Sequence, residues 1–306
     1  MHLTESVKNI LNNYDSESPG VKTNLSRLLM HGKLAGTGKI MILPIDQGFE
    51  HGPGRAFAAN PAAYDPHFFY EIAIEAGFSA YAAPIGLLEA GAGKYAGEIP
   101  LILKMNSGNA LNKHGTAPYQ AITSSIQDAL RLGCIGVGFT LYPGSDACNE
   151  MLDQLQLIIE EAKANGLIVV VWSYARGQIS KPGELSLDVI AYGAHMAALM
   201  GATLIKVKLP SNYLENELAK IEYLKHNVPM DSLVDRVKHV VQSCFNGKRM
   251  VVFSGGEAKD LESLYTEARA IVQGGGNGSI MGRNVFQRPR TDALAMIDNL
   301  MKIYKE

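Results

Sequence analysis

A short pattern recurs along this chain: a helix-like stretch ends in glycine, and an apolar run follows at once. Its five copies occupy residues 75–84, 131–143, 164–174, 199–210 and 273–285. Glycine after a helix readily takes the left-handed conformation that ends the helix. The runs that follow are rich in β-branched residues and almost continuously apolar, as is typical of parallel strands buried on both faces. The pattern therefore predicts helices that alternate with the strands of a parallel sheet.

Three more apolar runs complete the set of strands. They are residues 39–46, 100–106 and 249–256, which brings the predicted strands to eight. Helices are predicted between them at residues 65–76, 85–95, 117–132, 146–165, 184–200, 211–244, 257–272 and 290–304. Eight strand–helix units in 306 residues indicate the α/β class and a (β/α)8 TIM barrel. A doubly wound open sheet is the alternative, but it needs fewer strands. It also usually has a glycine-rich turn after the first strand, where this chain has Asp46-Gln47-Gly48.

The barrel is expected to be a single domain that follows a short extension. Residues 1–38 are predicted to form an N-terminal helical extension, and residues 39–306 the (β/α)8 barrel catalytic domain. No linker is evident within the barrel. Residues 211–248 are long for one crossover helix, and Pro229 is expected to divide them, with a second helix beginning near Ser232.

Composition argues against several classes of protein. Lys plus Arg number 28 and Asp plus Glu number 30, a net charge of −2, so no nucleic-acid partner is expected. No apolar run approaches the ~18 residues that span a membrane, and the N-terminus lacks the apolar segment of a signal peptide. Three cysteines at unrelated spacings favour neither a disulfide framework nor a structural zinc site. We therefore expect a cytoplasmic protein without a membrane partner.

The small share of charged residues bears on assembly. Asp, Glu, Lys and Arg make up 19% of the chain, below the usual share of about 25%. A weakly charged surface is expected to be covered in part by other subunits. The composition therefore favours a homo-oligomer.

Two lysines on the sixth predicted strand are the most informative candidates for chemistry. In a barrel of this type the active site forms at the carboxyl ends of the strands. Lys206 and Lys208 are two residues apart, so both are expected to point into the barrel. Burial and a second cation both lower the pKa of a lysine and make its amine nucleophilic. The alternative to this functional interpretation is that the strand is displaced in register and both lysine side chains extend to the rim of the barrel.

Two glycine turns after the seventh and eighth predicted strands form a candidate phosphate site. The loops at this position are a frequent phosphate site in the fold. Ser254-Gly255-Gly256 lets backbone N–H groups approach an anion closely. Gly282 allows the same approach, and Arg283 adds a fixed positive charge. Either glycine turn alone is often a plain turn, but both at the expected pair of strands favour phosphate binding.

Three further side chains end predicted strands. Asp46 is the natural counter-ion of the lysines, or else a helix cap or salt-bridge partner. Tyr174 is a usable proton donor if it lies opposite an amine. Trp172 shares its face, although aromatic residues at a barrel mouth are often only packing.

The histidines give little support for a metal site. No HxH, HxxxH or mixed acidic–histidine cluster stands at a predicted strand end. We therefore expect no metal and no cofactor.

These residues also lie in motifs that resemble a known family, the archaeal-type class I fructose-bisphosphate aldolases, whose bacterial branch belongs to the DhnA group. The motifs are ILPIDQGFEHGPG (42–54), VVWSYARG (170–177), LIKVKLP (204–210), VFSGG (252–256) and GRNVFQR (282–288). They occur in order, each at its own predicted strand, and the resemblance runs from about residue 33 to 305.

The resemblance implies a role for each matching residue. Lys206 would be the Schiff-base lysine, Tyr174 the proton donor, and Asp46 the group that binds substrate hydroxyls and assists proton transfer. Trp172 would line the pocket. The ketose 1-phosphate would be held by the two glycine turns, that is by Ser254, Gly255, Gly256, Gly282 and Arg283, and Lys208 would also contact substrate.

The implied function is metal-independent cleavage of fructose 1,6-bisphosphate to dihydroxyacetone phosphate and glyceraldehyde 3-phosphate, reversibly, by a large homo-oligomeric ring. Two departures affect the leaving-aldehyde side: Gln47 stands where many relatives have histidine, and Leu209-Pro210 replaces a Tyr-Thr-Gly turn. The alternatives are a related Schiff-base aldolase or acyl-transfer enzyme on another phosphorylated ketose, a metal-dependent aldolase or isomerase, and a non-catalytic sugar-phosphate sensor.

Overall fold

Eight parallel strands close into a barrel in the computed structural model, which describes residues 2–111, 117–256 and 259–306. The strands are β1 (Ile40–Pro44), β2 (Ala80–Ala83), β3 (Leu101–Lys104), β6 (Gly136–Leu141), β7 (Ile168–Ser173), β8 (Leu204–Val207), β9 (Met250–Ser254) and β10 (Gly278–Ile280). Each strand pairs with the next in this order, and β10 pairs with β1. The predicted (β/α)8 barrel is confirmed, and the open sheet is ruled out because the first and last strands are hydrogen-bonded.

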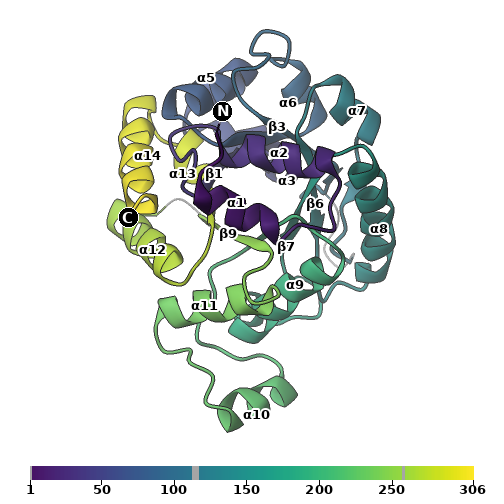
Figure 1. Ribbon diagram of the computed structural model, residues 1–306, viewed down its shortest axis with the longest axis vertical. Helices are drawn as coiled ribbons and strands as arrows, with labels where there is room; N and C mark the ends of the chain where they lie inside the picture. The colour runs from purple at the N-terminus through teal and green to yellow at the C-terminus, as the bar shows by residue number, and fades with distance from the viewer. Residues whose placement is uncertain (1, 112–116, 257–258) are drawn as a thin grey trace.

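Helices surround the barrel and follow the strands in turn (Figure 1). They are α5 (Pro66–Ala76), α6 (Ile85–Glu89), α7 (Ile126–Arg131), α8 (Cys148–Ala164), α9 (Leu187–Leu199), α11 (Leu233–Ser243), α12 (Leu261–Gln273) and α14 (Arg290–Tyr304). As expected from the recurring pattern, a glycine with positive φ follows α5, α7, α8, α9 and α12. Gly77, for example, follows α5 with φ 77° and donates its N–H to carbonyls of the last turn. Among the described residues, no helix is both long enough and apolar enough to cross a membrane.

The barrel interior and the N-terminal helices share one hydrophobic core. Helices α1 (Glu5–Asn12) and α2 (Pro19–Leu29) lie across the centre of the ring in Figure 1. Their apolar residues pack against the inward side chains of the strands. The Tyr14 hydroxyl donates to the carbonyl of Thr203 at 2.7 Å and accepts from the N–H of Met250 at 3.0 Å. These contacts close the amino-terminal end of the barrel. The cleft described below lies at the other end.

The structure differs from the prediction in several connections. The helix predicted over 117–132 is wrong in its first half, because β5 (Ala121–Ile122) pairs antiparallel with β4 (Asn106–Ser107) and the helix begins only after Ser125. The helix predicted over 85–95 ends at Glu89, ahead of a glycine-containing loop. Short helices that were not predicted follow two strands: α3 (Gln47–His51), α4 (Pro53–Phe57) and η1 (Pro61–Tyr64) after β1, and α13 (Arg283–Phe286) after β10.

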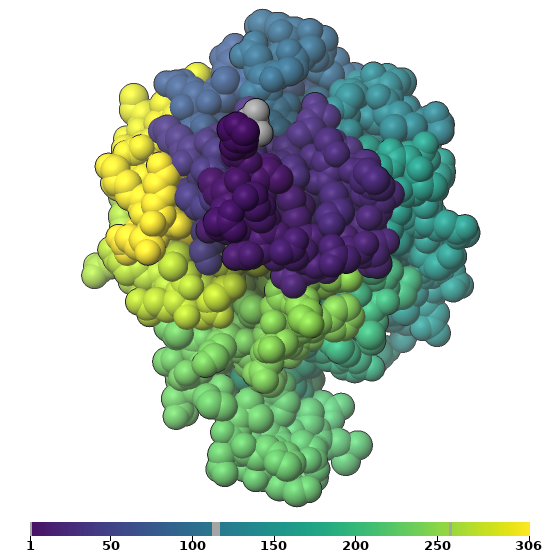
Figure 2. Space-filling view, in the orientation of Figure 1, coloured from purple at the N-terminus to yellow at the C-terminus, as the bar shows by residue number. Residues whose placement is uncertain are grey.

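The long segment after β8 forms two helices, as predicted. The first is α10 (Glu217–Lys225), which projects from the barrel at the lower end of Figure 2. The second is α11, whose first turn is capped by Ser232 and Asp235 in a reciprocal pair of hydrogen bonds. Pro229 lies between them. A short turn, η2 (Gly183–Leu185), precedes α9.

Candidate active site

A cleft of about 1190 Å³ opens at the carboxyl ends of the strands. Nine of the ten residues predicted for the site line it: Asp46, Tyr174, Lys206, Lys208, Ser254, Gly255, Gly256, Gly282 and Arg283. The tenth, Trp172, is buried beneath the cleft and is 1% exposed. The fold thus brings together residues that lie more than 200 positions apart in the chain.

Lys206 stands at the centre of this end of the barrel. It lies on β8, opposite Trp172 of β7, and is 5% exposed. Its Nζ is 5.5 Å from the ring centre of Trp172 and 5.6 Å from that of Tyr174. Burial lowers the pKa of Lys206 to about 8, against the opposing effect of the Asp46 and Glu50 carboxylates. At this pKa roughly a tenth of the molecules carry the neutral amine at pH 7 and about half at pH 8. The neutral amine is the form that attacks a carbonyl.

The expectation that Lys208 is a second ammonium group inside the barrel is wrong, since its side chain is 25% exposed. Strand β8 ends at Val207, so strand alternation no longer fixes the direction of the next residue. Lys208 lies at the rim of the cleft, where its Nζ is 3.3 Å from a carboxylate oxygen of Glu184. Glu184 also binds Arg176 at 2.6 Å and Lys181 at 2.8 Å.

The buried cation near Lys206 is Lys104, a role that the sequence analysis did not identify. Lys104 ends β3 and is 2% exposed, with its Nζ 5.9 Å from the ring centre of Trp172. Its positive charge lowers the pKa of Lys206, although less than burial does. The signal in the sequence was a lysine at the end of the apolar run LILK.

Lys104 is held by a hydrogen-bonded network that reaches the cleft. Its Nζ donates to the backbone carbonyl of Asn106, to the Asn106 side chain at 3.1 Å and to Gln120 Oε1 at 2.9 Å. The amide of Gln120 then donates to Glu50 Oε1 at 3.0 Å and to the Tyr142 hydroxyl at 2.7 Å. Gln120 precedes β5, so the unexpected β4–β5 pair positions this network.

Glu50 is a second group that the sequence analysis left without a role. It lies on α3 and lines the cleft. Burial and the nearby Asp46 carboxylate raise the pKa of Glu50 to about 7, with the charge of Lys104 opposing the shift. A carboxyl group with this pKa can donate or accept a proton at neutral pH.

Trp172 forms part of the floor under Lys206. Its ring lies against Gly138 of β6, where a Cβ would come within 2.0 Å of the ring. Its indole Nε1 is buried and makes no hydrogen bond with any described residue. The family resemblance implied that Trp172 lines the pocket, whereas the structure places it one layer lower.

Tyr174 and Asp46 flank the amine. Burial raises the pKa of the Tyr174 hydroxyl above its ordinary value, and a hydrogen bond with Ser254 opposes the shift. The phenol therefore keeps its proton and can donate it. Asp46 occupies the N-cap position of α3 but makes no capping hydrogen bond through its side chain. Its negative charge raises the pKa of Lys206, so it acts electrostatically as a partner of the amine.

The two glycine turns are joined by Asn284, which is fully buried. Its side chain donates to the carbonyl of Gly255 at 3.0 Å and accepts from the N–H of Lys259 at 2.9 Å. Gly282 packs so closely that a Cβ would come within 2.7 Å of the Pro44 carbonyl. Arg283 follows it, and its charge is among those that lower the pKa of Lys206. The two glycine turns and the positive charge of Arg283 thus line the same cleft as the amine, an arrangement that suits an anion.

No group of three or more His, Cys, Asp or Glu side chains is arranged to hold a metal ion in the part of the chain that the structure describes. The side chains that are present support carbonyl chemistry instead. A partly neutral amine can form an imine, a phenol and a carboxyl group can move protons, and the adjacent turns can bind a negatively charged substituent.

Comparison with known proteins supports this chemistry. Residues 40–288 match the DeoC/LacD family of aldolases. A probable class 1 fructose-bisphosphate aldolase of Chlamydia muridarum is 32% identical over 93% of this chain and 84% of the relative. A class 1 fructose-bisphosphate aldolase of Halobacterium salinarum is 33% identical over 88% of this chain and 91% of its own. A solved archaeal fructose-1,6-bisphosphate aldolase, with its catalytic lysine bound to the carbinolamine intermediate, is 29% identical. It superposes with a TM-score of 0.77 over 92% of this chain and 99% of that one.

Proposed function

The chain belongs to the DeoC/LacD aldolase family, and from that premise we propose that it is a Schiff-base aldolase that cleaves fructose 1,6-bisphosphate to dihydroxyacetone phosphate and glyceraldehyde 3-phosphate, reversibly. The observation that carries the proposal is the Lys206 amine, buried at the carboxyl end of the barrel with its pKa lowered to about 8. The names of the relatives supply the substrate, and the two glycine turns beside Lys206 are consistent with its phosphate.

The reaction begins with imine formation. The neutral amine of Lys206 attacks the C2 ketone of the substrate, and loss of water gives an iminium ion. The Asp46 carboxylate assists removal of the proton from the C4 hydroxyl. The C3–C4 bond then breaks, its electron pair moves to the iminium to give an enamine, and glyceraldehyde 3-phosphate leaves. Because the iminium accepts these electrons, the step needs no metal or cofactor.

The second half of the reaction returns the enzyme to its starting state. The Tyr174 phenol gives its proton to C3 of the enamine, and the iminium forms again. Water then adds at C2 and releases dihydroxyacetone phosphate together with the free amine of Lys206. We assign the 1-phosphate of the ketose to Ser254, Gly255, Gly256, Gly282 and Arg283, and a substrate contact at the rim to Lys208. A cytoplasmic location and a homo-oligomer accompany this proposal as predictions.

Borohydride trapping with dihydroxyacetone phosphate tests the proposal. Reduction fixes the imine as a secondary amine, and peptide mapping locates it. We expect the adduct on Lys206, no adduct in Lys206→Ala, and a trappable adduct with impaired turnover in Lys208→Ala. An adduct on Lys104 or Lys208 would overturn the assignment. Trapping without cleavage of fructose 1,6-bisphosphate would instead point to the alternative enzymes that act on other phosphorylated ketoses.

A further inference from the structure

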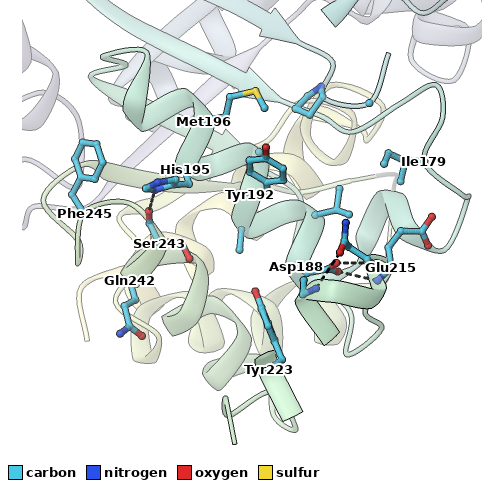
Figure 3. Close-up of a pocket in the computed structure, with 17 residues that line it drawn as sticks. Ile179, Asp188, Tyr192, His195, Met196, Glu215, Tyr223, Gln242, Ser243 and Phe245 are labelled. Carbon is cyan, nitrogen blue, oxygen red and sulfur yellow. Dashed lines mark hydrogen bonds between the residues drawn. The ribbon is translucent and has the colours of Figure 1, made fainter. Parts of the chain in front are cut away.

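Helix α10 is only lightly covered by the rest of the molecule. It is nine residues long, stands away from the barrel (Figure 2), and contains no buried residue. A helix of this length is unstable alone in water, so it needs contacts with other parts of the structure. One side of α10 has such contacts. Ala219 and Tyr223 line a pocket of about 990 Å³ between α9, α10 and α11, into which Tyr223 points in Figure 3.

The inward side of α10 is fixed at this pocket. The Tyr223 hydroxyl lies 2.7 Å from His239 Nε2 of α11. The loop before α10 is fixed as well, because Asp188 of α9 accepts hydrogen bonds from the N–H groups of Glu215 and Asn216 at 3.0 and 2.8 Å. These contacts within the chain fix the orientation of α10 and therefore determine which of its residues face outward.

The outward side of α10 is apolar. Leu218 is 77% exposed, Ile221 57% and Leu224 63%. At 3.6 residues per turn these side chains fall within one sector of about 120°, opposite Ala219 and Tyr223. Scattered exposed leucines are ordinary, but three on one side of one projecting helix form a contiguous patch of the kind that marks an interaction surface.

The sequence of α10 is complementary to itself when it is reversed. It runs Glu217-Leu-Ala-Lys-Ile221-Glu-Tyr-Leu-Lys225. A two-fold axis beside Ile221 places each Leu218 level with the Leu224 of the other copy, and each Glu217 level with the other Lys225. The carboxylate and the ammonium lie in the same sector as the apolar stripe, one on either side of Ile221. Both are exposed, and each lies 3.7–3.8 Å from a neighbour on its own helix, Lys220 for Glu217 and Glu222 for Lys225.

We propose that α10 is an interface with a second copy of this chain, in which two α10 helices pack antiparallel around Ile221 and two Glu217–Lys225 ion pairs flank the apolar stripe. The self-complementary charge pattern favours a second copy over an unrelated partner. A surface that packs against a copy of itself across a two-fold axis must carry both charges, at positions that the axis brings together. None of the residues in α10 lines the catalytic cleft. The interface is therefore separable from the active site.

Charge reversal tests the pairing. Glu217→Lys and Lys225→Glu each place like charges at both ends of the interface, so we expect each single variant to halve the mass measured by light scattering. The double variant Glu217→Lys/Lys225→Glu exchanges the two charges, and we expect it to recover the mass of the original protein. The double variant also loses both ion pairs within the helix. If its mass recovers, the loss of mass in the single variants came from contact between copies and not from a less stable helix.

A cross-link provides a second measurement that does not depend on disruption. In Ile221→Cys the two thiols face each other across the axis, and mild oxidation should join most chains into disulfide-linked pairs. The matched control is Glu222→Cys, one residue along and outside the apolar stripe, which should cross-link at least tenfold more slowly. Turnover per subunit should stay within twofold throughout, so failure of this proposal is distinguishable from failure of the aldolase assignment. Unchanged mass in both single variants, or equal cross-linking at 221 and 222, would overturn the pairing.

Discussion

A single added methyl group at Gly138 should impair catalysis through Trp172. Gly138 lies on β6 and faces the barrel interior, where a Cβ would stand 2.0 Å from Cζ3 and 2.3 Å from Cη2 of Trp172. Carbon atoms in contact are about 3.5–4.0 Å apart, so the ring would have to move by roughly 1.5 Å. Trp172 is 1% exposed, so its ring is enclosed by the protein. The Nζ of Lys206 lies 5.5 Å from the ring centre, so this displacement reaches the reactive amine.

The magnitudes separate the two effects of Gly138→Ala. Overpacking a core costs about 1–3 kcal/mol, which should appear as a lower urea midpoint of unfolding. Misplacing a reacting group by about 1 Å can cost on the order of a hundredfold in rate. We therefore expect kcat for cleavage of fructose 1,6-bisphosphate, and the rate of borohydride trapping, to fall about a hundredfold in protein that is still folded.

The matched control is Gly86→Ala, the same substitution on exposed α6, where a Cβ meets nothing within 4 Å. It should leave kcat unchanged and stabilise the chain by up to about 1 kcal/mol through helix propensity. If Gly138→Ala keeps the kcat and the urea midpoint of the original protein, the tryptophan does not position the amine. The reasoning from Gly138 to Lys206 would then be refuted.

Three further predictions concern the charges in the cleft. The rate of imine trapping should rise with pH and level off above about 8, because only the neutral Lys206 amine attacks. Glu50→Gln should shift this midpoint to lower pH, since the Glu50 carboxylate raises the pKa of Lys206, and a midpoint that stays or rises would contradict the assignment. Arg283→Ala should lower kcat/KM for fructose 1,6-bisphosphate about tenfold to a hundredfold, the value of a charge-assisted contact of about 1.5–3 kcal/mol. For a ketose without the 1-phosphate, kcat/KM should fall much less. Equal falls in kcat/KM for both substrates would show that Arg283 has a structural role instead.

The barrel could be predicted because its strands and turns are encoded locally. Each strand is a short apolar run, and the glycine before it, such as Gly77, ends a helix in the left-handed conformation. The connections depend on contacts between distant segments and could not be predicted in the same way. The β4–β5 pair forms because Asn106 and Ser107 pair with Ile122 and Ala121. The spacing of apolar residues in 117–132 does not predict this pairing.

Site residues that lie within a strand could be placed from the sequence, because side chains alternate along a strand. Residues beyond the end of a strand could not. Lys206 lies within β8, so its inward direction followed from alternation with Ile205 and Val207. Lys208 lies beyond the strand, and the same rule gave the wrong position. Lys104 was left without a role for another reason: the side chains that it approaches depend on the register between strands. It pairs with Gly138 on β6, and the missing side chain there leaves room for Trp172 from the next strand.

Burial, more than any neighbouring charge, prepares Lys206 for reaction, and the N-terminal helices contribute to that burial. Desolvation is the largest cause of its lowered pKa, ahead of the cations Lys104 and Arg283. The amine stands on Trp172, which packs on inward apolar side chains of the barrel, and these in turn pack on α1 and α2. If the amino-terminal end were open, water could reach this layer and would favour the charged ammonium. The N-terminal helices, which lie outside the repeating strands and helices, therefore close the far end of the same apolar column that keeps the amine partly neutral.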